Sequence, residues 1–127
     1  MNKLVIGITI FLILLLGLSV YGYREVVNSA EPILDKLNKL ETEIQNEDWQ
    51  TAKTTNEALQ DRWEKTQNLW TPLVDHSRVD GLENSLIKIK KAVNEEEKTE
   101  ALLEIAVSRR LVQNVPNTQK INFKNIF

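Results

Sequence analysis

The N-terminal segment Leu4–Tyr23 reads LVIGITIFLILLLGLSVYGY and holds no charged residue in twenty positions. At about 1.5 Å rise per residue, a helix of this length spans roughly 30 Å, the thickness of the hydrocarbon core of a bilayer. Tyr21 and Tyr23 stand at its far end and Arg24 follows, a pattern typical of the headgroup boundary. The segment predicts a single transmembrane helix inside an N-terminal anchor, residues 1–24. The first expected partner is therefore the lipid bilayer, contacted through Leu4–Tyr23.

A cleaved signal peptide is the competing interpretation of this segment. Such a peptide has an apolar run of about 7–15 residues that ends in a small-x-small site. The run here is longer, and its one weak candidate site is Gly17-Leu18-Ser19. We expect an uncleaved signal anchor, with cleavage as the alternative.

The charges that flank the span predict its orientation. Lys3 and the terminal amine precede it, whereas Arg24 on the other side is followed at once by Glu25. Positive flanks favour the cytoplasmic side of a membrane. We therefore expect the N-terminus in the cytoplasm and the rest of the chain on the outside of the cell membrane.

The composition beyond the span disfavours several classes of function. From Arg24 onward there are 15 Lys and Arg residues against 18 Asp and Glu residues, a net charge of −3. Nucleic-acid binding needs concentrated positive charge, so we expect no nucleic-acid partner. The sequence contains no cysteine, which excludes disulfides and thiolate chemistry. It also lacks the Walker, HExxH and GxSxG motifs, so we expect no enzyme, no catalytic residue, no cofactor and no metal.

Apolar residues recur at helical spacing in four stretches beyond the anchor. They are Ile33, Leu37, Leu40 and Ile44; then Trp49, Ala52, Leu59, Trp63 and Trp70; then Leu82, Leu86, Ile89 and Val93; and finally Leu102, Ile105, Leu111, Val112 and Val115. We expect Ser29 to cap the first helix, with Pro32 in its first turn, and Pro72 and Pro116 to end the second and fourth helices. The predicted fold is all-α: a transmembrane helix and then a four-helix bundle over residues 28–116, built from two αα-hairpins at about 30–71 and 78–115.

The two predicted hairpins align when the chain is shifted by 49 residues. Ile33 then overlays Leu82, and Ala52 overlays Ala101. A duplicated hairpin explains this alignment, and so does the chance agreement of two heptad-like pairs, so both explanations stay open.

Residues 117–127 are expected to form an extended C-terminal tail. Four large apolar side chains in it are costly to leave in water: Ile121, Phe123, Ile126 and Phe127. We expect the tail to pack on its own bundle; docking into a partner and lying on the membrane are the alternatives.

Asp75-His76 is the pair closest to a reactive constellation, with His76 as a base that Asp75 orients. Adjacent side chains point in different directions and no nucleophile is identifiable nearby, so hydrogen bonding at a helix end is the expected role. The three tryptophans share one helix face and favour the core, and Trp70, beside Pro72, is the best candidate for exposure. The residues with which the chain would contact a partner are therefore Trp70, Asp75, His76, Ile121, Phe123, Ile126 and Phe127.

Several short elements along nearly the whole chain carry a family resemblance. They are the anchor, Asn46–Ala52 (NEDWQTA), Trp63 and Trp70, Val74-Asp75-His76 with Val79-Asp80, and the closing Asn125-Ile126-Phe127. With these the sequence resembles the bacterial family known as domain of unknown function 4363. The resemblance implies a single-pass membrane protein of a Gram-positive, often spore-forming bacterium. That family has no assigned activity, so no catalytic residue transfers, and Ser77-Arg78 departs from the acidic residue expected after the Asp-His pair.

The sequence as a whole favours a non-enzymatic interaction or accessory module at the outer face of the cytoplasmic membrane. Its expected partner is another membrane protein or an envelope protein. The alternative is a sensor that binds a small ligand or a lipid inside the bundle. Only three residues precede the span, which counts against signalling across the membrane.

Overall fold

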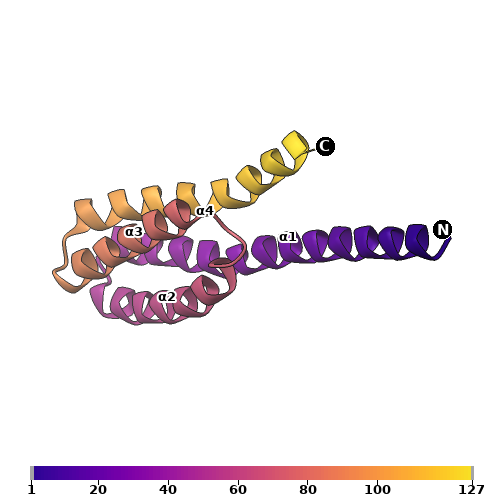
Figure 1. Ribbon diagram of the computed structural model, residues 1–127. Helices are drawn as coiled ribbons and strands as arrows, with labels where there is room; N and C mark the ends of the chain where they lie inside the picture. The colour runs from indigo at the N-terminus through magenta and orange to yellow at the C-terminus, as the bar shows by residue number, and fades with distance from the viewer. Residues whose placement is uncertain (1, 127) are drawn as a thin grey trace.

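The computed structural model describes the backbone of residues 2–126 and the side chains of residues 2–115. Four helices account for most of this backbone: α1 (Asn2–Gln45), α2 (Trp49–Trp70), α3 (His76–Asn94) and α4 (Lys98–Ile126). α1 and α3 each pack against both α2 and α4, so the helices surround one core, and the residues described include no strand (Figure 1). The predicted all-α bundle of two αα-hairpins is confirmed.

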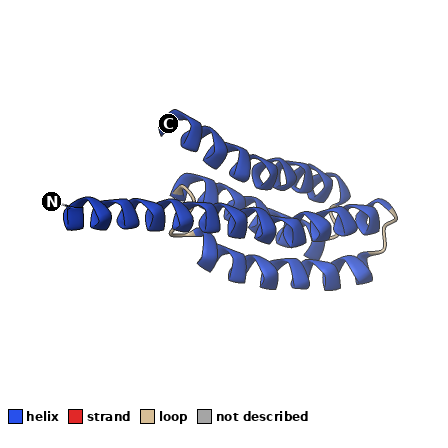
Figure 2. Cartoon of the chain, turned by 90° about the vertical axis from the view of Figure 1, so that its right-hand side faces the viewer, coloured by secondary structure: helices blue, strands red, loops and turns tan. Residues whose placement is uncertain are grey.

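α1 is one helix of 44 residues that supplies both the apolar span and one wall of the bundle. Every residue from Asn2 to Tyr21 is exposed, and Val26 is the first buried residue. Its buried side chains then follow helical spacing: Val26, Ala30, Ile33, Leu37, Leu40 and Ile44. The N-terminal half projects from the bundle as a straight rod in both views (Figures 1 and 2). No loop separates the expected anchor from the bundle.

The expected helix start at Ser29 is wrong, because this residue lies inside α1. Its hydroxyl donates to the carbonyl oxygen of Val26 at 3.0 Å, and Pro32 is also inside the helix. Starting a helix is the costly step, and here the helix already exists when the chain reaches Ser29. Pro32 removes one backbone hydrogen bond, which is a local cost that α1 tolerates.

The α1–α2 and α3–α4 turns share one geometry. Glu47 and Glu96, which are 49 residues apart, both have φ of 56°. In each turn the next amide donates back to a carbonyl five residues earlier, which is the Schellman arrangement. The distances are 2.9 Å from Asp48 N to Glu43 O and 2.8 Å from Glu97 N to Ala92 O. The 49-residue alignment of the sequence therefore has a counterpart in the backbone of these two turns.

α2 ends at Trp70, as expected from Pro72, but α4 differs from the expectation at the C-terminus. Pro116 does not end the helix, and residues 117–126 are helical rather than extended. Proline fixes φ near −65°, a value that a helix accepts, so one lost hydrogen bond and a local clash do not prevent the helix from continuing. The side chains of Ile121, Phe123, Ile126 and Phe127 lie outside the described residues, so their docking remains a prediction.

The chain direction places the α2–α3 turn and the end of α4 on the side of the bundle from which the span projects. Figures 1 and 2 both show the C-terminus and the free half of α1 on this side. The α1–α2 and α3–α4 turns lie at the opposite, distal end. The bundle therefore has a span-proximal end and a distal end, and the candidate residues divide between them.

Candidate functional site

Trp70 is a core residue, contrary to the exposure expected for it. Its side chain is fully buried, and its indole N–H donates to the Ser29 hydroxyl oxygen at 2.7 Å. Its ring meets that of Trp63 edge to face, with centroids 5.7 Å apart and planes at 82°. Because α1 continues past this position, it covers the end of α2. Trp70 joins the two helices and is not available to a partner.

Asp75 caps the N-terminus of α3, in agreement with the hydrogen-bonding role at a helix end that the sequence predicts. Its carboxylate accepts from the backbone N–H of Ser77 at 3.4 Å and from the Ser77 hydroxyl at 3.1 Å. His76 is the first residue of α3, and both members of the pair are exposed. The carboxylate is thus directed toward Ser77, and contact of Asp75 and His76 with a partner remains a prediction.

The α2–α3 turn lies against α1 at the end of the span. Gly22 on α1 faces Leu73 in the turn, since a Cβ added at Gly22 would lie 3.4 Å from Leu73 Cδ2. Val74, the next residue of the turn, is buried. The Leu73 side chain is still 38% exposed. Sequence reasoning missed this contact, because the two residues lie far apart in the chain. The available signal was an apolar residue inside a Thr-Pro-Leu turn.

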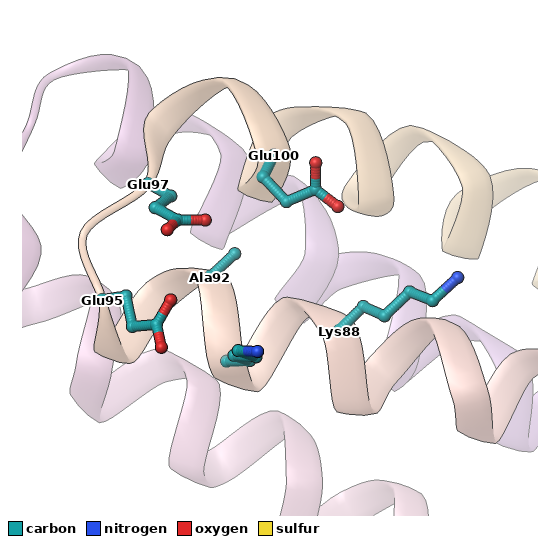
Figure 3. A pocket seen from close by; sticks show the side chains of 6 residues that line it. Lys88, Ala92, Glu95, Glu97 and Glu100 are labelled. Atoms are coloured by element: carbon teal, nitrogen blue, oxygen red, sulfur yellow. The ribbon is translucent and has the colours of Figure 1, made fainter.

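A shallow depression of about 290 Å³ lies at the distal end, where α3 turns into α4 (Figure 3). It is lined by Lys88, Lys91, Ala92, Glu95, Glu97 and Glu100. Figure 3 shows Ala92 on α3 with its methyl group pointing toward Glu97 and Glu100, and the Lys88 side chain extended along the helix. Charges of both signs line the depression, and the described residues hold no cluster of three or more potential metal ligands.

Three polar side chains are buried between α3 and α4: Ser85, Glu104 and Ser108. The Ser85 hydroxyl lies 3.0 Å from Glu104 Oε2 and 2.6 Å from the Ser108 hydroxyl. Lys88 Nζ stands 4.0 Å from the other carboxylate oxygen, Oε1. His76 precedes Ser85 by nine residues on α3, about 13 Å along the helix, so it is not placed to activate either serine. These contacts hold α3 against α4 and need no reactive role.

α1 is long enough and apolar enough to cross a membrane. Its most apolar stretch of 18 residues has a mean hydropathy of 2.7, and none of these residues is buried in the bundle. Elsewhere the described apolar stripes are covered by neighbouring helices. The exposed half of α1 is therefore the feature of the fold that most needs a non-aqueous environment.

The chain matches the family described as domain of unknown function (DUF4363) over residues 20–126. It belongs to the DUF4363 family. The matched region begins near the end of the Leu4–Tyr23 stretch and includes the residues that form the bundle in this chain. No curated protein and no solved structure matches this chain. The comparisons confirm the expected family, and DUF4363 itself carries no assigned activity.

Proposed function

We propose that this DUF4363 protein is a non-enzymatic interaction or accessory module, held by a single transmembrane helix at the outer face of the cytoplasmic membrane. The observation that carries the proposal is the continuity of α1. One helix presents the uncharged Leu4–Tyr23 stretch without cover and then enters the core at Val26. An exposed apolar surface of this length is unusual for a protein in water and is suited to a bilayer.

The outward orientation is supported by the charges at the two ends of the span. Lys3 lies on one side, and Glu25 closely follows Arg24 on the other. The positive-inside bias favours the side of Lys3 in the cytoplasm and the bundle outside.

An interaction role is supported by apolar side chains on the outside of the bundle. Leu103 and Val107, one turn apart on α4, are 57% and 41% exposed. Together with the exposed Asp75 and His76, they are candidate contacts for another membrane protein or an envelope protein. The buried polar groups, in contrast, are explained by packing between helices.

The sensor alternative receives less support. A lipid or small apolar ligand would need an apolar cavity, and pockets of this kind are lined mainly by hydrophobic side chains. The depression at the distal turn is shallow and is lined by three glutamates and two lysines. Its chemistry does not suit such a ligand.

Carbonate extraction of bacterial membranes tests the anchor. The protein should stay in the pellet and keep the residues of the Leu4–Tyr23 span, as its mass shows. A soluble product that lacks the residues up to Ser19 would contradict the proposal and support the cleaved alternative.

Photo-cross-linking tests the interaction role. A photoreactive residue at Leu103 in living cells should give one defined adduct with a membrane or envelope protein, identified by mass spectrometry. Glu57, exposed on α2, is the matched control position. Identical adducts from both positions, or none from Leu103, would contradict a specific partner surface on α4.

A further inference from the structure

Resting on the membrane anchoring proposed above, we propose that the α2–α3 turn binds the lipid surface beside α1, with Leu73 at the boundary between hydrocarbon and headgroups. The bundle would then touch the bilayer at a second point besides the span.

The depth follows from the contact between Leu73 and α1. A Cβ at Gly22 would lie 3.4 Å from Leu73 Cδ2 and 3.9 Å from Cδ1. Gly22 is the last residue but one of the uncharged span Leu4–Tyr23. When the span occupies the hydrocarbon core, Leu73 therefore lies at the same level as the end of the span.

The turn is held in this position by the helices that it joins. Trp70, three residues before Leu73, donates to Ser29 on α1 at 2.7 Å. Val74, directly after it, is 7% exposed. Val26, four residues beyond Gly22 and thus only about 6 Å along α1, is fully buried. No spacer lets the bundle lift away from the bilayer, because α1 is continuous through this region.

The chemistry of the turn suits a lipid interface. Thr71, Pro72 and Leu73 are exposed, and the stretch Thr66–Val74 contains no charge in a chain that is 27% charged. The next charge, Asp75, is directed to the N-terminus of α3 through Ser77. Tyr21, also exposed, lies on α1 at the same level, where phenols favour the headgroup region.

The absence of cysteine from the sequence makes a direct depth measurement possible. A nitroxide is attached to single cysteines in the full chain, reconstituted in vesicles of phosphatidylcholine and phosphatidylglycerol. The positions are Leu73→Cys, Leu14→Cys in the span, and Leu103→Cys on the distal part of α4, which is 57% exposed. Power saturation then compares collisions with oxygen, which concentrates in lipid, and with a water-soluble nickel chelate.

We expect the label at Leu73 to collide with the nickel chelate several-fold less than the label at Leu103. Its oxygen accessibility should lie between those of Leu103 and Leu14, as a position at the boundary requires. Thr71→Cys, on the same turn, should behave like Leu73→Cys and leaves the leucine in place. Circular dichroism shows for each labelled chain that the helix content is retained.

Two other results separate the inference from the proposed function. If Leu73 and Thr71 are as accessible to nickel as Leu103 while Leu14 is in lipid, the turn does not bind the bilayer and this inference is overturned. If Leu14 is also accessible to nickel, the span is not in the membrane, and the anchoring is overturned with it.

Discussion

Trp70 on α2 donates its indole N–H to the Ser29 hydroxyl oxygen on α1 across 2.7 Å. This bond joins α1 and α2 at the span-proximal end of the bundle. Ser29 can accept it because α1 runs through this position without a break. The bond thus couples the helix that is proposed to cross the membrane to the core of the bundle.

Ser29→Ala should destabilise the bundle by about 1–3 kcal/mol, because it leaves a buried indole N–H without its acceptor. Urea denaturation of the full chain in detergent micelles, followed by circular dichroism, measures the change. Thr54→Ala, a surface change on α2 that also removes a hydroxyl, should stay within about 0.5 kcal/mol. In a Trp70→Phe background the donor is gone, so Ser29→Ala should cost little. An equal loss in both backgrounds would show that the bond contributes nothing.

Trp63→Ala should cost roughly 3–5 kcal/mol, as large-to-small changes in a core do. The side chain is 4% exposed and packs edge to face on Trp70. Its indole nitrogen is buried, and no hydrogen-bond partner for it occurs among the described residues. Trp63→Phe should therefore cost much less than Trp63→Ala in the same denaturation assay. A loss below about 1 kcal/mol for Trp63→Ala would place the residue on the surface.

Glu47→Gly and Glu96→Gly should each stabilise the bundle by about 0.5–1 kcal/mol. Both residues hold a left-handed conformation that glycine adopts without a steric penalty. Each substitution also removes one exposed ion pair at 3.8 Å, with Lys98 and Lys53 respectively, a small loss. Glu64→Gly, at an exposed position inside α2, should instead destabilise by about 1 kcal/mol. Thermal melts of the three variants compare them, and opposite effects at Glu47 and Glu96 would contradict the equivalence of the two turns.

Deletion of Ile121–Phe127 tests the role of the C-terminal end of α4. If these residues pack on their own bundle, as we expect, the melting temperature falls by about 4–8 °C per kcal/mol lost and association is unchanged. If they dock into a partner, the bundle keeps its stability and the photo-adduct at Leu103 is lost or reduced. A variant unchanged in both measurements would contradict either role.

The periodic stripes of the sequence predicted the core well. Four of the predicted core residues are fully buried: Ile33, Leu37, Leu40 and Ile44. Apolar side chains at helical spacing share one face of the helix, and that face leaves water by packing against the apolar faces of other helices. Helix ends were less predictable. The signals at Ser29 and Pro116 resemble a start and a stop, and each is overridden because extending an existing helix costs less than beginning a new one.

Of the candidate site, the sequence predicted only the contacts between residues that are close together in the chain. Asp75 caps α3 through a residue two positions away, a relationship that the sequence contains. The burial of Trp70 and the contact of Leu73 with Gly22 depend on α1 running past the end of α2. That arrangement arises from packing between distant segments, and no spacing along the chain encodes it.

An intact α1 is proposed to hold the bundle outside the cytoplasmic membrane. Labelling of single cysteines in living bacteria with a membrane-impermeant maleimide tests this arrangement. Asn94→Cys, at the exposed distal end of α3, should be labelled in intact cells on a chain of full length. Asn2→Cys should be labelled only after the cells are permeabilised. Labelling of Asn94→Cys that requires permeabilisation, or that appears only on a chain without the span, would contradict an anchored bundle outside the membrane.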